Sequence, residues 1–479
     1  MQYEVQHFIN GKFVNGGDRF EVYYPATGEV LGTAPDGGQA EVNAAVEAAK
    51  QAFEKWSRTK PSERRQILNR FADLIRKHSD ELARIETLDV GRPISENSRH
   101  YLERVAANIS FFADFVTMIG SESYPMENGY INYVLRQPVG VAALITPWNV
   151  PLLLETWKIG PALAFGNTVV LKPAEWTPLG AWKLAQIAQE ADLPPGVFNV
   201  VHGHGPNSAG EFLTTHPDVA LVSFTGETTT GQTIMRAGAA TLKRYSFELG
   251  GKGANIIFED ADIARALEIA KKAAFFNQGE FCLAGSRIFV QKSIYDRFVS
   301  EFIELTKKIK VDDPMDPKTE MGALIAPEHL DRVLGFVQAA KQDGNEVLVG
   351  GEQLILPGSL SKGNYMMPTV IAAGFQDKIC LDEVFGPVVT VTPFETEEEV
   401  IEWANGTRYG LSGVVQTRDV SRAHRVAAAM KVGTVWVNDF FVRDLRVPFG
   451  GMKYSGIGRE GGHYSMEFYT ELVNICVAI

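Results

Sequence analysis

Apolar side chains recur at helical spacing over much of the first 120 residues. In the longest such stretch, Ile67, Phe71 and Leu74 fall on one side of a helix. The pattern predicts amphipathic helices at 41–56, 62–88 and 95–118. Apolar and polar residues then alternate over 120–137, which predicts an extended β-hairpin.

After the hairpin, the pattern changes to short apolar runs separated by helical segments. The runs predict buried strands at 140–145, 168–171, 198–201 and 220–224. The segments between them predict helices at 152–163, 180–191 and 210–215. Strands that alternate with helices in this way form a parallel sheet with right-handed crossovers.

A second block of strands and helices starts at residue 255. It predicts strands at 255–258, 287–291, 347–349, 388–394 and 434–437, and helices at 263–276, 294–308 and 327–342. The two blocks meet at the glycine-rich segment 247–252, a candidate hinge. We therefore predict an α/β fold with two doubly wound parallel-sheet domains. The hairpin and a C-terminal strand at 463–479 would form a smaller β unit.

The charge balance excludes several classes of partner. The 479 residues include 46 Lys and Arg against 58 Asp and Glu, which gives a net charge of −12, and no basic run exceeds two residues. Nucleic-acid binding needs a basic face and anionic membranes attract basic segments, so we expect neither partner. We find no signal peptide and no apolar run near the roughly 20 residues of a membrane helix. A cytoplasmic protein is expected.

The chain has three cysteines, and no two of them form a CxxC pair. This sparse, odd count argues against a disulfide framework and a zinc site, so we expect a reducing compartment and no metal. Cys380 and Cys476 lie among apolar residues, where packing is their predicted role. Cys282 lies in a polar turn flanked by glycines, where a nucleophile would be accessible. A structural role is the alternative for Cys282.

Two glycine-rich turns follow predicted strands. They lie within 198–210 and 222–231, and each leads from a strand into the start of a helix. Backbone N–H groups at such a turn can approach a phosphate. Neither turn matches GxGxxG, so a tight turn without any ligand is the alternative.

Three further segments carry polar side chains with candidate chemistry. Glu175 lies three residues after Lys172, and its carboxylate can accept hydrogen bonds from both hydroxyls of a nucleotide ribose. The alternative is a surface ion pair between Glu175 and Lys172. Glu248 precedes two glycines by one residue and is a candidate general base, or else a paired structural carboxylate. Asn149 either points an amide donor at an oxyanion or caps the helix at 152–163.

These segments are part of a set of strings that resembles the NAD(P)-dependent aldehyde dehydrogenase superfamily. The strings keep the family order and span nearly the whole chain: TPWNVP (146–151), GNTVVLKPAEWTP (166–178), FTGETTTG (224–231), FELGGK (247–252), NQGEFC (277–282), EVFGPV (383–388) and PFGGMKYSGIGREGG (448–462).

A further set of strings is similar to the muconic-semialdehyde dehydrogenases of aromatic ring cleavage. These strings are TWKIGPALAFGNT (156–168), FFVRDLRVPFGG (440–451) and GGHYSMEFYTELVNICV (461–477). The first and last look most like the enzymes for 5-carboxymethyl-2-hydroxymuconate semialdehyde. The same branch includes enzymes for 2-hydroxymuconate and 2-aminomuconate semialdehydes.

The resemblance implies the roles of four catalytic residues. Cys282 matches the nucleophile, which attacks the aldehyde and then carries it as a thioester. Asn149 matches the oxyanion donor, which acts with the backbone N–H of Cys282. Glu248 matches the base that activates water to hydrolyse the thioester. Glu460 matches a position linked to proton relay in some members.

The resemblance also implies contacts to an NAD cofactor. Lys172 and Glu175 match the adenosine-ribose contacts, and Glu383 with Phe385 matches the nicotinamide-ribose side. The remaining positions on the cofactor side of the cleft are Ile145, Trp148, Gly205, Gly210, Gly226, Gly231 and Gly250. Many members have Ser where this chain has Glu227, beside the pyrophosphate. Because Glu175 would repel a 2′-phosphate, we expect NAD rather than NADP.

Two arginines are implied as substrate contacts. Muconic-type semialdehydes carry carboxylates away from the aldehyde, and a guanidinium pairs with a carboxylate through two hydrogen bonds. The resemblance implies that Arg104 and Arg443 hold the substrate carboxylate. A structural pair with Asp444 is the alternative for Arg443 and for Arg446.

Domain roles follow from the same resemblance: NAD binding for 1–119 with 138–248, catalysis for 249–438, and homodimer or homotetramer formation for 120–137 with 463–479.

Three alternative functions are open. One is a broad-specificity or other aldehyde dehydrogenase for aliphatic, aromatic or betaine-type aldehydes. Another is a CoA-acylating enzyme, in which the base Glu248 would have no use. The third is a non-catalytic protein, which the intact Cys282 and Glu248 disfavour.

Overall fold

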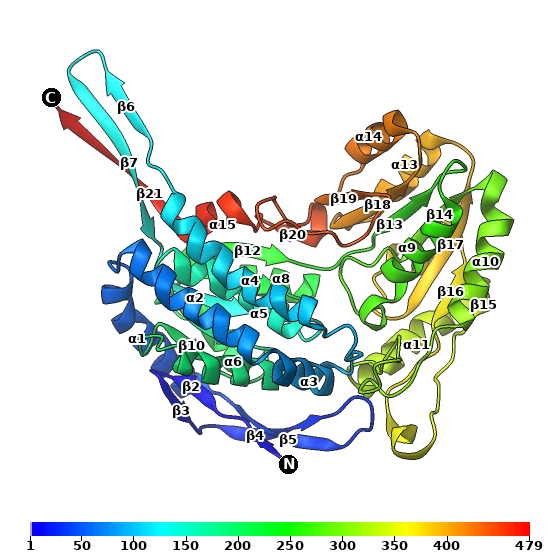
Figure 1. The fold of residues 1–479 in the computed structure, drawn as a ribbon, viewed down its shortest axis with the longest axis horizontal. Coiled ribbons are helices and arrows are strands. Elements are labelled where there is room, and N and C mark those ends of the chain that lie inside the picture. Colours follow the sequence, from blue (N-terminus) through cyan, green and yellow to red (C-terminus); the bar gives the residue numbers. More distant parts are fainter. Residues whose placement is uncertain (1) are drawn as a thin grey trace.

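The computed structural model describes residues 2–479. They form two α/β units, each built on its own large sheet, and a three-stranded arm that projects from the first unit (Figure 1). This architecture confirms the predicted α/β fold with two doubly wound sheets. The functional roles assigned to the domains stay predictions.

An eight-stranded sheet with the order β20-β12-β11-β8-β9-β10-β2-β3 forms the centre of the first unit. Its five middle strands, β12 to β10, run parallel, and the strands outside them pair antiparallel. The strands are β2 His7–Ile9, β3 Lys12–Val14, β8 Val141–Ile145, β9 Thr168–Lys172, β10 Phe198–Val200, β11 Val219–Thr225, β12 Arg244–Glu248 and β20 Gly456–Ile457.

Helices cover both faces of this sheet. The apolar faces of α2, α4, α5 and α6 pack on one side, and those of α1, α7 and α8 on the other. The helices are α1 Gln39–Trp56, α2 Pro61–Lys77, α3 Ser79–Val90, α4 Arg99–Phe115, α5 Pro151–Ala164, α6 Pro178–Glu190, α7 Ala209–Thr215 and α8 Thr228–Gly238. A small sheet, β1 Tyr3–Glu4, β5 Val30–Asp36 and β4 Asp18–Tyr23, lies beside them.

The single helix predicted over 62–88 is wrong, because two helices occupy this segment. α2 ends at Lys77 and α3 begins at Ser79, with His78 between them. Asp80 and Glu81 lie in the first turn of α3, where carboxylates favour a helix start. The apolar spacing continues across the break, so hydrophobic periodicity alone does not reveal it.

A seven-stranded sheet with the order β15-β16-β17-β14-β13-β18-β19 forms the second unit, and only its edge strand β15 runs antiparallel. The strands are β13 Ala254–Ile257, β14 Arg287–Gln291, β15 Glu346–Val349, β16 Thr369–Ala372, β17 Val388–Phe394, β18 Ser412–Gln416 and β19 Thr434–Val437. α9 Ile263–Phe275 and α10 Tyr295–Lys307 pack on one face. On the other lie α11 Pro327–Gln342, α13 Glu397–Asn405 and α14 Val420–Ala429; the short α12 Lys378–Leu381 precedes β17.

The chain crosses between the two units twice. It passes from β12 to β13 through the predicted hinge, and a Cβ at Gly251 would lie 2.2 Å from the carbonyl oxygen of Cys282, so this close approach requires glycine. After β19 the chain returns, and β20 pairs with β12 through Gly456 opposite Glu248. This return brings residues 438–462 beside the end of β12.

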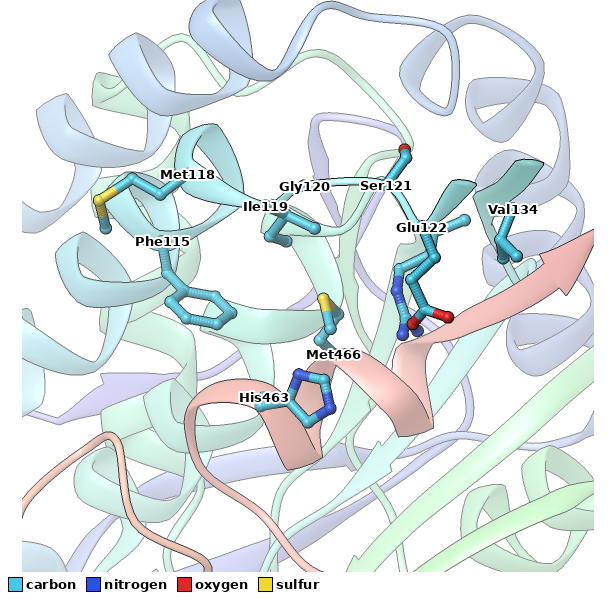
Figure 2. Close-up of a pocket in the computed structure, with 10 residues that line it drawn as sticks. Phe115, Met118, Ile119, Gly120, Ser121, Glu122, Val134, His463 and Met466 are labelled. Atoms are coloured by element: carbon cyan, nitrogen blue, oxygen red, sulfur yellow. The ribbon is translucent and has the colours of Figure 1, made fainter. Parts of the chain in front are cut away.

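The arm consists of the predicted hairpin, β6 Ser123–Met126 and β7 Tyr130–Pro138, and of β21 Thr470–Ala478. A strand over all of 463–479 is wrong, because α15 occupies Gly462–Tyr469 before β21 begins. The prediction that Cys476 packs among apolar residues is also wrong, since this residue is exposed on β21. Cys380 is buried, as predicted. Where the arm leaves the body, Phe115 from α4 and Met466 from α15 line a cavity of about 260 Å³ (Figure 2). Among residues 2–479, no helix combines the length and the apolar character that a bilayer span needs.

Candidate active site

A cleft of about 250 Å³ opens where the two units meet. Residues at the carboxyl ends of first-unit strands line one side, and residues of the second unit line the other. The lining residues are Pro147, Trp148, Asn149, Trp176, Thr225, Gly226, Glu227, Leu249, Gly250, Cys282, His329, Arg332, Glu383 and Phe385. In doubly wound sheets, ligands bind outside the carboxyl strand ends at the point where strand order reverses, which in the first sheet is β8.

Cys282 borders this cleft on a loop that follows α9. Burial raises the pKa of the thiol to about 12, Glu383 and Glu248 act in the same direction, and Arg443 opposes them. The resting side chain at neutral pH is therefore a thiol, and a neighbouring base must remove its proton before attack.

Asn149 does not cap helix α5, the alternative role predicted for this residue. The N-cap of α5 is Val150, and the amide of Asn149 instead donates from Nδ2 to the carbonyl oxygen of Glu280 at 2.9 Å. Asn277 stabilises this contact between Asn149 and Glu280, because its Nδ2 donates to the backbone carbonyl oxygens of both residues at 2.9 Å. The amide of Asn149 is thus fixed two residues from Cys282 along the nucleophile loop.

Glu248 ends β12 and is almost fully buried. Neither carboxylate oxygen has a hydrogen-bond partner among residues 2–479, so the paired structural reading does not hold. Burial raises the pKa of Glu248 well above its usual range, and the negative charge of Glu460 adds to this shift. Lys158, Arg443 and Arg459 oppose it. A carboxyl group with a raised pKa and a free lone pair suits general-base chemistry.

Glu460 is held by a lysine that the sequence patterns did not single out. Lys158 Nζ on α5 lies 2.9 Å from Oε1 of Glu460 and donates to Ser223 Oγ at 2.8 Å. The hydroxyl of Ser223 is 3.2 Å from the same carboxylate oxygen. The buried ion pair therefore lies beside Glu248, with Glu460 close enough to raise the pKa of that carboxyl.

Aromatic side chains surround the part of the cleft next to Cys282. The Trp148 ring lies 5.3 Å from Phe385, 5.1 Å from His329 and 5.6 Å from Trp176, centre to centre. Burial lowers the pKa of His329 to about 4, so this imidazole is neutral. A flat heteroaromatic ring can stack against such walls.

Glu383 reaches the cleft from the second unit. Its Oε1 accepts the backbone N–H of Gly251 at 2.7 Å, and burial raises the pKa of this carboxyl to about 7 against the opposing effects of Gly251 and Lys252. A Cβ at Gly250 would lie 2.2 Å from Oε2 of Glu383, so a larger residue there would displace this carboxylate from its present position. Gly226 also borders the cleft.

The other predicted cofactor residues lie outside the cleft lining. Strand register aligns Ile145 with Lys172 at the ends of β8 and β9. Lys172 is buried, the Glu175 side chain is 35% exposed, and Nζ of Lys172 lies 3.2 Å from Oε2 of Glu175, so the ion pair of the alternative is present and half-buried. Burial would raise the pKa of Glu175, but Lys172 and a backbone hydrogen bond more than offset it, and the pKa is lowered.

Glycines predicted on the cofactor side lie in the two strand-to-helix turns. Gly205 is in the turn after β10 and Gly210 is in the first turn of α7, where its N–H donates to the His204 carbonyl at 2.9 Å. Gly231 is in the first turns of α8, and a Cβ there would lie 2.8 Å from the Leu249 side chain that borders the cleft. Both turns therefore lie at carboxyl strand ends, as a phosphate site requires.

Arg104 and Arg443 rest on aromatic rings. The guanidinium carbon of Arg443 is 3.7 Å from the centre of the Phe449 ring, and that of Arg104 is 4.7 Å from Phe441. Burial lowers the pKa of Arg443 to about 10, and the like charge of Arg104 acts in the same direction. Asp444 pairs with Arg446 at 2.6 Å, which confirms the structural alternative for Arg446. Buried Nε of Arg443 has no hydrogen-bond partner within residues 2–479.

Sequence reasoning missed Lys158, His329 and Arg332. A lysine inside the apolar run TWKIGPALAF is itself a signal, because a buried cation needs a partner. His329 and Arg332 are three residues apart on α11, so they share one helix face. No short motif marks that pair, and only the fold places it at the cleft.

Comparisons with known proteins show which family this chain is similar to. Residues 13–475 match the model of the aldehyde dehydrogenase family. The chain is 47% identical to 2-hydroxymuconic semialdehyde dehydrogenase of Pseudomonas sp. (strain CF600), over 99% of this chain and 100% of the relative. Identity to 5-carboxymethyl-2-hydroxymuconate semialdehyde dehydrogenase of Escherichia coli is 46%, over 96% and 98%.

A solved structure shows the same similarity. PnpE from Pseudomonas sp. WBC-3, in complex with nicotinamide adenine dinucleotide, matches with a TM-score of 0.97 and 42% identity, over 100% of this chain and 98% of PnpE. A cysteine at the cleft, a buried carboxyl beside it and full-length similarity to these relatives lead to one conclusion. The chain belongs to the aldehyde dehydrogenase family.

Proposed function

We propose that this aldehyde dehydrogenase oxidises a carboxylated muconic-type semialdehyde to the acid, with NAD as the hydride acceptor. The observation that carries the substrate class is the pair Arg104 and Arg443. Both guanidinium groups rest on aromatic rings, so their donors are available to an anionic substrate. The two relatives described above are named for semialdehydes of this class.

The reaction proceeds through Cys282. A base takes the thiol proton, and the sulfur attacks the aldehyde carbon to give a thiohemiacetal whose oxyanion accepts from the Asn149 amide and the Cys282 N–H. NAD, when bound, supplies the hydride acceptor. The resulting thioester is hydrolysed by water that Glu248 deprotonates, which releases the acid and restores the thiol. Lys158 and Glu460 lie beside Glu248, and they can take up the proton that Glu248 receives from water.

The cleft residues fit a dinucleotide cofactor. Trp148 and Phe385 provide aromatic walls, Glu383 offers an acceptor for a ribose hydroxyl, and Gly226 leaves space near the turn into α8. Lys172 and Glu175 would bind the adenosine ribose, and the ionised Glu175 favours NAD over NADP. Glu227 borders the same cleft, and we propose that it turns from the pyrophosphate toward a ribose or water.

A homodimer or homotetramer is proposed on the basis of the arm. β6 and β21 are the outer strands of its sheet, and free strand edges pair readily with another chain. The arm also exposes large apolar side chains: Tyr124, Met126, Tyr130, Leu135, Leu472 and Val477. Sedimentation of the intact protein against a chain truncated after Tyr469 tests this role, and an unchanged mass for the truncated chain would contradict it.

A substrate panel tests the proposed reaction. We expect kcat/KM for 2-hydroxymuconate and 5-carboxymethyl-2-hydroxymuconate semialdehydes to exceed that for hexanal by at least about tenfold, or about 1.4 kcal/mol. The Cys282→Ala variant should form no NADH with any of them. Equal kcat/KM for hexanal would overturn the substrate class but not aldehyde oxidation. Product formation only in the presence of CoA would instead establish the acylating alternative.

A further inference from the structure

The loop that carries the nucleophile has an unusual backbone. Asn277 and Gln278 have φ angles of 51° and 55°, and Gly279 follows with φ of 69°. Two successive non-glycine residues in the left-handed region are unfavourable unless the surroundings hold them there. Cys282 lies shortly after this turn, so whatever stabilises the turn also places the thiol.

Glu96 holds the turn from a distant part of the chain. It lies in the connection between α3 and α4, and its two carboxylate oxygens lie 3.1 and 3.4 Å from the backbone nitrogen of Asn277. A carboxylate that accepts a backbone N–H makes a stronger bond than a neutral acceptor does. Glu96 therefore fixes the first left-handed residue of the nucleophile loop.

The side chain of Asn277 carries this constraint to the oxyanion side of the cleft. Its Nδ2 donates to the carbonyl oxygens of Asn149 and Glu280, and Asn149 Nδ2 donates to the same Glu280 oxygen. Each of these three hydrogen bonds is 2.9 Å long. A shift of Asn277 would therefore displace the Asn149 amide.

The surroundings keep Glu96 in place. Arg92, which is fully buried and stacks on the Tyr101 ring at 4.1 Å, attracts the carboxylate. Burial raises the pKa of Glu96 to about 7, and Arg92 and the Asn277 N–H oppose that rise. The carboxylate borders a surface cavity of about 330 Å³ together with the exposed Glu268.

We propose that Glu96 is a positioning residue for aldehyde oxidation: by accepting the Asn277 N–H, it holds the Asn149 amide in the reactive arrangement. The inference rests on the proposed catalytic role of Asn149. Glu96 touches neither substrate nor cofactor, so its loss should lower kcat while KM for NAD stays nearly constant.

Two variants separate positioning from charge. Glu96→Gln keeps the length and an acceptor oxygen, whereas Glu96→Asp keeps the charge but withdraws it by about 1.5 Å. We expect kcat of Glu96→Gln within about threefold of the wild type, and kcat of Glu96→Asp lower by about ten- to a hundredfold, because misplacement of about 1 Å can cost a factor of about 100. If Glu96 served only to neutralise Arg92, the Asp variant would keep its activity and the Gln variant would lose it, which would overturn the proposal.

A double-mutant cycle with Asn149→Ala identifies the path. If Glu96 acts through Asn149, kcat of the double variant Glu96→Asp with Asn149→Ala should equal that of Asn149→Ala alone within about twofold. Full additivity would overturn the inference and leave the proposed function standing. Unchanged kcat of Asn149→Ala would instead remove the oxyanion role on which the inference rests. Glu268→Ala, a carboxylate change in the same cavity, is the matched control and should leave kcat unchanged.

Discussion

The ammonium of Lys158 lies 2.9 Å from Oε1 of Glu460, and the two side chains are only 0% and 4% exposed. Ser223 contacts both partners through its hydroxyl, at 2.8 Å from Nζ of Lys158 and 3.2 Å from Oε1 of Glu460. A buried ion pair of this kind contributes little net stability but is costly to break. Lys158 opposes the rise in the pKa of Glu248 and Glu460 adds to it, which links the pair to the proposed base.

Substitution Lys158→Met should shift the pH dependence of turnover. The cation stabilises the ionised form of Glu248, so its removal raises the pKa of that carboxyl further. Hydrolysis of the thioester needs the carboxylate, which is present above the pKa; activity at neutral pH should fall and recover as the pH rises. Stopped-flow measurement of kcat between pH 6 and about 10 checks this.

A stability change should accompany the Lys158→Met substitution. Glu460 would remain buried without its cation, at a cost of about 3–5 kcal/mol in the free energy of unfolding. Lys50→Met is the control, since Lys50 pairs with Asp218 at the surface and should alter neither stability nor the pH profile. An unshifted acid limb in Lys158→Met would separate Lys158 from the titration of Glu248.

Glu248→Gln should trap the acyl-enzyme. The amide has nearly the same shape but cannot accept a proton from water, so the thioester on Cys282 should outlive the first turnover. General-base assistance is worth about 10²–10⁴ in rate, and kcat should fall by that factor. Intact-protein mass spectrometry after one equivalent of NAD and excess aldehyde would show the adduct. Normal turnover with no adduct would remove Glu248 from hydrolysis.

Hydrophobic patterning predicts most of both central sheets. β14, β17 and α11 match their predicted bounds, because each is a clear apolar run or an amphipathic stretch with distinct ends. The N-terminal strands are not predicted, since they are short and mixed in polarity. β2 depends on pairing with β10, which lies far along the chain, and a local pattern contains no information on that partner.

The candidate site divides in the same way. The catalytic roles of Cys282 and Asn149 can be predicted from local sequence and family resemblance, because few structural roles call for these residue types in a turn or at a strand end. Contacts that depend on chain crossings cannot. Lys158 meets Glu460 only because the C-terminal segment returns to β12, and Glu96 reaches Asn277 only because the α3–α4 connection contacts the second unit.

Cofactor choice should depend on Glu175. Lys172 keeps the pKa of this carboxyl low, so it is ionised at neutral pH and repels a 2′-phosphate. We expect kcat/KM for NAD to exceed that for NADP by at least about tenfold, or about 1.4 kcal/mol. Glu175→Gln should reduce this ratio, whereas Glu227→Gln, a change of a carboxylate in the cleft lining, should not. Equal kcat/KM for both cofactors in the wild type would show that Glu175 does not face the ribose.

Substrate choice should depend on Arg104 and Arg443. Each rests on an aromatic ring, so truncation to alanine removes a charge without breaking an ion pair to the protein. For a dicarboxylate semialdehyde, each Ala variant should lose about 2–5 kcal/mol in kcat/KM, because the substrate carboxylate would be buried without its partner. Steady-state kinetics with the semialdehyde and with hexanal measures this loss, and hexanal should be nearly unaffected.

Arg446→Ala provides the matched control for the two arginines. It lies in the same loop as Arg443, but its guanidinium pairs with Asp444 and its side chain is 77% exposed. Exposed pairs contribute at most about 1 kcal/mol, so kcat/KM for both aldehydes should stay near the wild-type value. Equal losses for charged and neutral aldehydes in Arg104→Ala and Arg443→Ala would mean that the arginines hold the fold around Phe441 and Phe449. A loss confined to the charged aldehyde, absent in Arg446→Ala, would assign recognition to the two arginines on aromatic rings.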